Sequence, residues 1–474
     1  MEATRRTRNR TTSALLTGAL LASCAEDAPA LEQTRAALRD DVWITTSRDS
    51  VELTRWAIGD AAERMERRDG PSGRDEVALR VPRGMLADIS EAQHREHHRC
   101  GGFILQETET EAMAALATPE NHERLYAPPY TVDNAATVEK LMPEAKEANV
   151  LATIRKLAAF RTRFHTSPTG EEAAVYIRDA WKALATGRDD ITVELVEHQK
   201  TPQSSIKLTM RGTSSPDEIV VLGGHMDSIS GRGSNTALAP GADDNASGIA
   251  VLTEVMRVAV ALNYRPARTV VVYGYAAEEI GLVGSAEIAA KAKADKLNVA
   301  GVLQLDMTNF TSAQMPYIGL LTDFVDPVLN EFSIKLIEQY VKIPYKQFKC
   351  GYGCSDHASW TKNGFPATSP HEADMNQANQ QIHTTNDTLT LSKDSAGHSM
   401  HFVRFGLAFM AELAKGKLEA PANPLACDAT KACAAGLRCD NGMCVPESSD
   451  AGAPQPAQCV SNAECPNGQT CQNG

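Results

Sequence analysis

Residues 241–275 read GADDNASGIAVLTEVMRVAVALNYRPARTVVVYGY, a pattern that points to the fold class of the chain. An acidic bend is followed by a long amphipathic run with helical spacing, and then by a short β-branched run that is typical of a buried strand. Similar strand-like runs lie at 191–198, 218–224 and 300–307. Strands that alternate with helices favour an α/β fold with a mostly parallel central sheet and helices on both faces.

The bend raises a question of charge, because Asp243 and Asp244 are adjacent between Gly241 and Gly248. Two neighbouring carboxylates repel each other, so such a bend becomes favourable when a cation lies beside it. In parallel sheets, ligands collect beyond the carboxyl ends of the strands. The remaining ligands of a cation are therefore expected in the loops that follow the predicted strands.

Five segments near predicted strand ends carry side chains of the metal-binding type: GGHMDS, GADDNASG, AAEEIGLVGS, LQLDMTN and QIHTTNDT. Each alone has an ordinary explanation, such as a buried histidine, a solvated acidic face or a turn aspartate. Their joint occurrence in one α/β domain favours a metal centre. Two imidazoles with several carboxylates and no cysteine suit zinc, with manganese or cobalt as substitutes. The candidates are His225, Asp227, Asp244, Glu278, Glu279, Asp306 and His383.

On these segments, residues 126 to about 415 resemble the secreted bacterial dizinc leucyl aminopeptidases, which have them in the same order and spacing. The resemblance implies a zinc-exopeptidase fold of the phosphorylase/hydrolase type. It also implies two Zn²⁺ ions per chain and hydrolysis of the first peptide bond of peptides or proteins. By the resemblance, Asp244 bridges the two ions, His225 and Asp306 complete one site, and Glu279 and His383 complete the other.

The same resemblance assigns roles around the metals. Glu278 would be the general base that accepts a proton from the attacking water, and Asp227 would orient His225. The segment CGYGCSDHASW matches a family loop, which implies a disulfide between Cys350 and Cys354. Tyr352 in that loop would help to hold the tetrahedral intermediate. Asp243 is expected to shape the bend without binding metal.

The segment TSPHEADMNQANQQIH, residues 368–383, departs from the family pattern. The family has apolar and aromatic walls around the first side chain of the substrate at this place. Here the expected pocket is lined by smaller or polar groups as well as apolar ones. Leucine preference is therefore in doubt, and polar or small first residues are expected to compete better. The pocket residues are Met307, Ser369, His371, Met375, Ala378 and Ile382.

Two other functions fit parts of the pattern. A related zinc carboxypeptidase or amidohydrolase also has a two-metal site, but its sequence usually contains a lid domain between the later metal ligands. Only 76 residues separate Asp306 from His383, which is too few for such a lid. A non-catalytic binding protein on this fold, with its role in the cysteine-rich tail, would be expected to have lost ligands, and none is missing.

The first 24 residues resemble an export signal, with basic residues followed by the uncharged stretch 13–23. The stretch ends in LASC, which resembles a lipobox and would make Cys24 a lipid anchor; an ordinary secretory signal is the alternative. A twin-arginine signal is weakly supported by Arg5 and Arg6. We expect an exported protein, either secreted or held as an outer-membrane or periplasmic lipoprotein. Seven of eleven cysteines lie between Cys427 and Cys471, which favours disulfides in an oxidising compartment.

These features predict five parts: a signal peptide at 1–24, a charged, helical propeptide at 25–125, and a catalytic domain at 126–417. A linker with one cysteine-rich repeat (418–446) and a linker with a second repeat that ends early (447–474) follow. The tail is expected to bind an unknown surface partner. Cys100, or a histidine near it, is a candidate zinc cap that keeps the precursor latent; a purely steric propeptide is the alternative.

The net charge is -13, which disfavours nucleic acid and anionic lipid surfaces as partners. The apolar stretch near the N-terminus is too short to be a permanent transmembrane helix. Peptide or protein N-termini are the expected substrates, and we expect a monomer.

Overall fold

The computed structural model describes residues 41–419, with the exception of 72–74, 98, 100, 118–124, 127 and 312–315, together with two short strands at 437–440 and 443–446. The chain divides into two units, Met1–Leu418 and Glu419–Gly474. The predicted signal segment with Cys24, the linkers, most of the cysteine-rich repeats and Cys100 lie outside the described residues.

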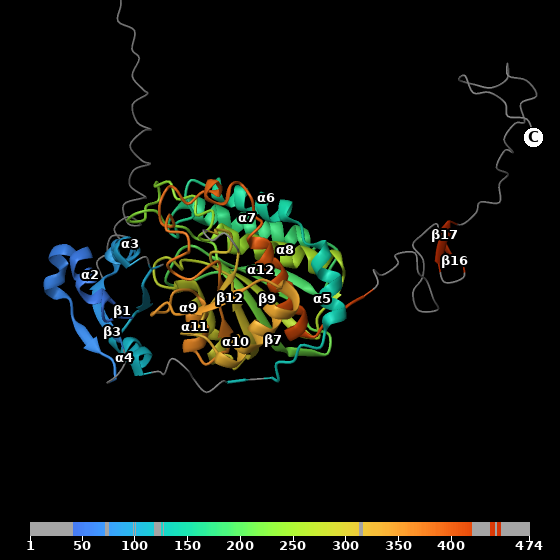
Figure 1. The fold of residues 1–474 in the computed structure, drawn as a ribbon, viewed down its shortest axis with the longest axis horizontal. Helices are drawn as coiled ribbons and strands as arrows, with labels where there is room; N and C mark the ends of the chain where they lie inside the picture. The colour runs from blue at the N-terminus through green and yellow to red at the C-terminus, as the bar shows by residue number, and fades with distance from the viewer. Residues whose placement is uncertain are drawn as a thin grey trace, which may run out of the picture. The chain divides into compact units, whose positions relative to one another are not determined.

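A six-stranded mixed sheet forms the centre of the first unit (Figure 1), with strand order β13-β10-β7-β9-β6-β5. Strands β13, β10, β7 and β9 are parallel, whereas β6 and β5 run antiparallel to their neighbours. The sheet is mostly parallel, as expected, and β6 alone of its six strands runs against the others, because the eight residues between β5 and β6 are too few for a crossover helix. The strands are β5 (Ile191–Val196), β6 (Ser205–Met210), β7 (Ser215–His225), β9 (Arg268–Tyr275), β10 (Asn298–Gln304) and β13 (Ala367–Thr368).

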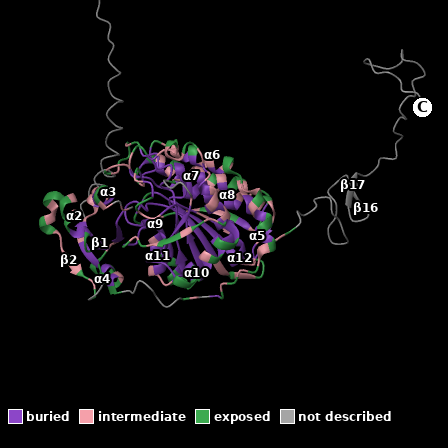
Figure 2. Ribbon diagram, in the orientation of Figure 1, coloured by how far each residue is buried: buried purple, intermediate pink, exposed green. Residues whose placement is uncertain are grey.

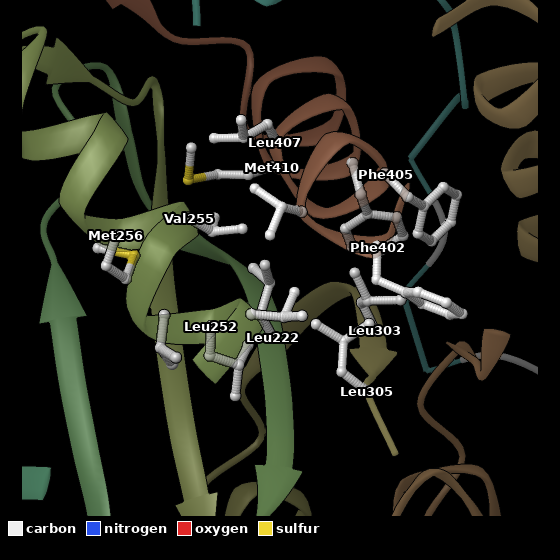
Figure 3. Close-up of a cluster of buried hydrophobic side chains, with 14 of the residues drawn as sticks. Leu222, Leu252, Val255, Met256, Leu303, Leu305, Phe402, Phe405, Leu407 and Met410 are labelled. Carbon is white, nitrogen blue, oxygen red and sulfur yellow. The ribbon is translucent and has the colours of Figure 1, made fainter. Parts of the chain in front are cut away.

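Helices cover both faces of this sheet. Alternate residues of β7 enter different apolar clusters, with Leu222 on one face and Val221 on the other. Figure 3 shows the first face, where side chains of α8 and α12 meet Leu222, Leu303 and Leu305. Trp360 lies in the cluster of the second face. The first face is covered by α5 (Ala135–Leu141), α6 (Glu147–Ala158), α7 (Pro168–Leu184), α8 (Ala246–Ala261), α10 (Pro327–Leu336) and α12 (Ser399–Ala414), and the second by α9 (Val283–Ala294) and α11 (His357–Lys362).

A small three-stranded sheet lies beside the central one and supports the predicted pocket. Its order is β12-β11-β14, with β11 (Ile318–Leu321) between β12 (Tyr345–Phe348) and β14 (Pro370–His371). Figure 2 shows the buried interior formed by the central strands and the helices against them. Among the described residues, no helix combines the length and apolar character needed to cross a membrane.

Within the first unit, residues 41–117 form a smaller α/β structure, the N-terminal unit. Its antiparallel sheet has the order β2-β3-β1-β4, and three helices complete it. The expectation of a charged, helical segment is met only in part, because helices α2, α3 and α4 form while the runs 42–44 and 77–79 form buried strands. The elements are β1 (Asp41–Ser47), β2 (Arg67–Asp69), β3 (Glu76–Pro82), β4 (Phe103–Gln106), α2 (Ser50–Ala57), α3 (Leu86–His97) and α4 (Glu109–Ala117).

Candidate metal centre and active site

The predicted metal-type residues converge beyond the carboxyl ends of three adjacent parallel strands. His225 is the last residue of β7, Asp306 follows β10 by two residues, and Glu278 and Glu279 follow β9. Asp244 lies just before α8. Because these strands are neighbours in the sheet, loops that are far apart in the sequence meet at one place.

The distances define a carboxylate–histidine cluster with Asp244 at its centre. His225 Nε2 lies 3.0 Å from Asp244 Oδ1 and 3.3 Å from Asp306 Oδ1. On the other side, His383 Nε2 lies 3.3 Å from Asp244 Oδ2 and 2.8 Å from Glu279 Oε2. The two oxygens of one carboxylate therefore face two separate imidazoles. The cluster consists of His225, Asp244, Glu278, Glu279, Asp306 and His383.

All six residues of the cluster are buried. Burial raises the pKa of Glu278 well above its usual value, and the neighbouring carboxylates raise it further. Burial alone would lower the pKa of His383, but the Glu279 and Asp244 carboxylates raise it to about 10. Even with both imidazoles protonated and Glu278 neutral, the three other carboxylates of the cluster, when ionised, would exceed the positive charge. Such a donor set suits a bound divalent cation, which supplies the missing charge.

Donor atoms of His225, Asp244 and Glu279 lie within 4.8 Å of one another, as a shared metal site requires. Glu278 Oε2 is buried and has no hydrogen-bond partner among the described residues. An unpaired buried oxygen is unfavourable unless it has a functional partner. Nitrogen and oxygen ligands without sulfur fit zinc in this position.

Asp227 holds two parts of the cluster together. Its carboxylate lies 3.4 Å from His225 Nδ1, a charge contact without the geometry of a hydrogen bond. It also accepts hydrogen bonds from the backbone N–H groups of Glu278 (3.0 Å) and Glu279 (3.2 Å). This second contact, which the sequence pattern does not predict, fixes the loop after β9.

Two supporting residues were missed, although both lie in segments that the sequence had singled out. Ser355 Oγ donates a 2.6 Å hydrogen bond to Asp306 Oδ2. Asp387 accepts from the backbone N–H groups of Asp243 (3.1 Å) and Asp244 (3.0 Å). These bonds hold the acidic bend. The Asp243 carboxylate accepts from Asn309 N (2.9 Å), which ties the bend to the loop after Asp306.

Close backbone approach brings α8 to the loop that carries Asp306. Asn245 caps α8 by accepting from Gly248 N, and its amide donates to Leu305 O at 3.0 Å. A Cβ at Gly248 would lie 2.3 Å from the same Leu305 oxygen. Only glycine fits at this position, so residue 248 allows Asp244 and Asp306 to lie close together.

Several non-glycine residues beside the cluster have left-handed backbone angles. Ala277 precedes Glu278 with φ 54°, Met307 follows Asp306 with φ 51°, and His383 itself has φ 54°. Such conformations cost free energy and persist where the surroundings hold them. The packing of the site therefore imposes the direction in which these loops leave the cluster.

A pocket opens beside the cluster and contains the predicted substrate-pocket residues. Cys350 and Cys354 are joined by a disulfide, with their Cα atoms 6.3 Å apart, and form part of its wall together with Tyr352. The cavity itself has a volume of about 20 Å³. Its other lining residues include Met307, Leu321, Ser369, His371, Met375, Ala378 and Ile382.

The N-terminal unit lies over this pocket. His94, near the end of α3, lines the pocket, and its ring centroid is 4.8 Å from that of His383. The Arg99 guanidinium lies over the Tyr352 ring, 5.4 Å from its centroid. Further back, Leu105 N in β4 donates to Gly281 O at 3.1 Å. The unit therefore contacts the loops that carry Glu279, His383 and Tyr352.

Comparison with known proteins finds similarity to peptidases and aminopeptidases. Residues 206–405 match the model of peptidase family M28. A probable aminopeptidase of Saccharomyces cerevisiae is 30% identical over 344 residues, which is 71% of this chain and 91% of the yeast protein. Leucine aminopeptidase 1 of Coccidioides posadasii is 33% identical over 313 residues, which is 63% of this chain and 79% of that protein.

Solved structures resemble the chain over most of its length. The crystal structure of LapB from Legionella pneumophila has a TM-score of 0.68 and 30% identity, and covers 79% of this chain and 100% of LapB. LapA aminopeptidase from the same organism has a TM-score of 0.67 at 24% identity, which supports the fold alone; the match covers 81% of this chain and 100% of LapA.

Proposed function

The chain belongs to peptidase family M28, and from this premise we propose that it is an exported dizinc aminopeptidase of the secreted bacterial type. The observation that carries the proposal is the placement of Asp244, whose two carboxylate oxygens face His225 and His383 separately. Aminopeptidase activity is also the activity named for its relatives in yeast and Coccidioides.

Two Zn²⁺ ions fit the donor set. His225, Asp306 and Asp244 Oδ1 would hold one ion, and His383, Glu279 and Asp244 Oδ2 would hold the other. When bound, such a pair polarises the scissile carbonyl and lowers the pKa of water. The chain itself contributes the geometry, because Asp227, Ser355 and Asp387 fix the ligands through the hydrogen bonds described above.

Glu278 is the proposed general base. Its carboxylate is buried in the cluster, yet it stays out of the Asp244-centred contacts to the two imidazoles. A carboxylate in this position can accept a proton from the attacking water and deliver it to the leaving amine. The bonds from Glu278 N and Glu279 N to Asp227 keep the base and its neighbour in fixed relative positions.

Tyr352 is the proposed oxyanion donor, because it lines the pocket beside Ser355 and Asp306. Its loop is held by the Cys350–Cys354 disulfide and by bonds from Cys350 N and Gly351 N to Asp323. A donor held in advance at the developing charge lowers the barrier more than a mobile one. The pocket beside it would receive one side chain, which favours cleavage after the first residue.

The proposed zymogen is supported by the position of the N-terminal unit. Phe103 and Leu105 of β4 pack in one apolar cluster with Ile280 and Val283, directly after the Glu278–Glu279 pair. His94 lies at the pocket, which supports this histidine as the latency device; Cys100, the other candidate, lies outside the described residues. Release of residues 25–125 as a propeptide would open the pocket.

The remaining assignments concern the ends of the chain. We propose the signal at 1–24, with Cys24 lipidated or removed, the catalytic domain at 126–417, and the cysteine-rich repeats at 418–446 and 447–474 as a surface-binding tail. The proposed enzyme acts as a monomer on peptide or protein N-termini. The N-terminal basic and apolar pattern and the clustered cysteines support export.

One panel of assays tests the proposed activity. The full chain, before and after limited proteolysis near residue 125, is given leucyl-p-nitroanilide, its N-acetylated form, and a C-terminally free dipeptide with a blocked amine. We expect hydrolysis of the unblocked substrate alone, strongest after proteolysis, and its loss with a chelator. Cleavage of the blocked substrates would contradict an aminopeptidase and favour a carboxypeptidase or amidohydrolase.

A further inference from the structure

The pocket beside the carboxylate–histidine cluster has one polar wall. Ser369 and His371 are two residues apart in the extended segment 367–371, which contains β13 and β14, so their side chains project from the same face of it. Both line the pocket. Thr368, the last residue of β13, points to the opposite side, and its hydroxyl donates to Asn330 Oδ1 at 2.6 Å. The segment therefore presents its polar groups at 369 and 371 to a substrate side chain.

The ring of His371 is held in one tautomer. Its Nδ1 lies 3.1 Å from the carbonyl oxygen of Ala373, and because a carbonyl only accepts, Nδ1 carries the hydrogen. The ring also packs edge-on against Phe348, with centroids 6.0 Å apart. In the neutral imidazole, Nε2 is then the acceptor. The pocket wall thus offers a fixed hydrogen-bond acceptor.

Ser369 offers a second polar group. Its side chain is buried, and its Oγ has no hydrogen-bond partner among the described residues. A buried hydroxyl without a partner is unfavourable. A polar substrate side chain that reached Oγ would remove this cost, whereas an apolar side chain of the same shape would leave it in place.

The rest of the wall is not built for a charged side chain. Met307, Leu321, Met375 and Ile382 are apolar. The Asn379 amide is already bonded to Asp243 and Asp387. Apart from Asp306 of the cluster, the described lining residues include no carboxylate that would pair with a substrate lysine or arginine. They include no lysine or arginine for an acidic side chain.

We propose that this pocket selects peptides whose first residue has an uncharged, hydrogen-bonding side chain, namely asparagine, glutamine, threonine or serine. Ser369 and His371 are the specificity-determining residues, since His371 Nε2 accepts from the substrate amide or hydroxyl and Ser369 supplies the second bond. This inference rests on the proposed aminopeptidase function and names its substrate class.

The test compares substrates of matched shape on the proteolysed chain: asparaginyl against leucyl and threonyl against valyl p-nitroanilides. We expect kcat/KM for the polar member to equal or exceed that of its apolar partner. In Ser369→Ala and in His371→Phe, the asparaginyl value should fall about tenfold, as expected for one lost hydrogen bond. The leucyl value should fall less, so the asparaginyl-to-leucyl ratio is the readout, and circular dichroism shows that the variants fold.

Thr368→Ser is the matched control, because it alters the same segment on its opposite face and should leave every ratio unchanged. Unchanged ratios in both pocket variants would overturn the proposal. So would a ratio that falls only because leucyl hydrolysis rises, or a wild-type chain that prefers leucyl to asparaginyl by a wide margin. Failure to hydrolyse any unblocked substrate would instead refute the proposed function itself.

Discussion

The carboxylate–histidine cluster and the N-terminal unit that lies over it are held by different kinds of interaction. The cluster is fixed by short polar contacts, such as Ser355 to Asp306 at 2.6 Å and Asp387 to the backbone of the acidic bend. The N-terminal unit is held by apolar packing of β4 and by ring contacts of His94 and Arg99, with a few polar contacts besides, such as the bond from Leu105 N to Gly281 O and the ion pairs of Arg232 with Asp88 and of Lys362 with Glu76. The polar contacts fix the geometry of the cluster. The N-terminal unit contains no residue of the cluster, so its removal would leave all six in place.

Because the two regions are held differently, we expect each of them to have a separate function. Directional hydrogen bonds specify atom positions, as metal binding and proton transfer require. Apolar packing brings two surfaces together, but it tolerates substitution of the packed side chains and release of one surface from the other. Changes within the cluster should therefore affect metal and chemistry, while changes in the N-terminal unit should affect access to the site.

The largest effect is expected for Glu278→Gln in the proteolysed chain. The amide keeps the shape of the side chain but accepts no proton, so kcat should fall about 10²–10⁴-fold while the zinc content stays at the wild-type value. Leucyl-p-nitroanilide kinetics and metal analysis of the same sample measure both. Glu194→Gln on the exposed side of β5 is the control and should change neither. Loss of zinc in Glu278→Gln would make Glu278 a ligand and remove it as the base.

Ser355→Ala tests whether the polar contacts around the cluster set its geometry. Without the bond to Asp306 Oδ2, zinc affinity should weaken about 10–100-fold, as is typical when the partner of a metal ligand is removed. A competition titration with a zinc chelator measures this affinity directly. Ser359→Ala, on α11 with its hydroxyl bonded to Ser285, is the matched control. Equal affinity in the two variants would show that Asp306 needs no support from Ser355.

His94→Ala tests the N-terminal unit in the chain before proteolysis. Removing the ring from its place against His383 should raise the activity of the uncut chain about fivefold, in line with the loss of one aromatic contact. After proteolysis, the variant and the wild type should be equal. Glu96→Ala, exposed on the same helix, is the control. If Cys100→Ser activates the uncut chain and His94→Ala does not, the cysteine and not the histidine is the cap.

The sequence could predict the residues of the cluster because each of them lies in a short segment whose pattern can be recognised by itself. His225, Glu279 and Asp306 lie at or just after strand-like runs, and the parallel sheet brings such strand ends together. It could not predict the N-terminal sheet as well, because the strands at 41–47 and 76–82 are short and lie among charged segments with helical character. The pairing of β4 with the loop at Gly281 depends on contacts across more than 170 residues, which no local pattern reveals.

The supporting residues show the same limit. Asp387 lies only four residues after His383, yet its role comes from backbone bonds to Asp243 and Asp244, more than 140 residues away. The antiparallel placement of β5 and β6 also depends on pairing that the apolar pattern alone does not specify. The residue types at strand ends were predictable, whereas the contacts that fix them required the three-dimensional structure.

Asp244 is proposed to serve two metal ions at once, and zinc analysis of the purified wild-type chain beside Asp244→Asn is the decisive measurement. We expect two zinc ions per wild-type chain, and loss of both ions together with activity in the variant. A wild-type chain that holds a single zinc, or a variant that keeps two, would contradict the shared role of Asp244.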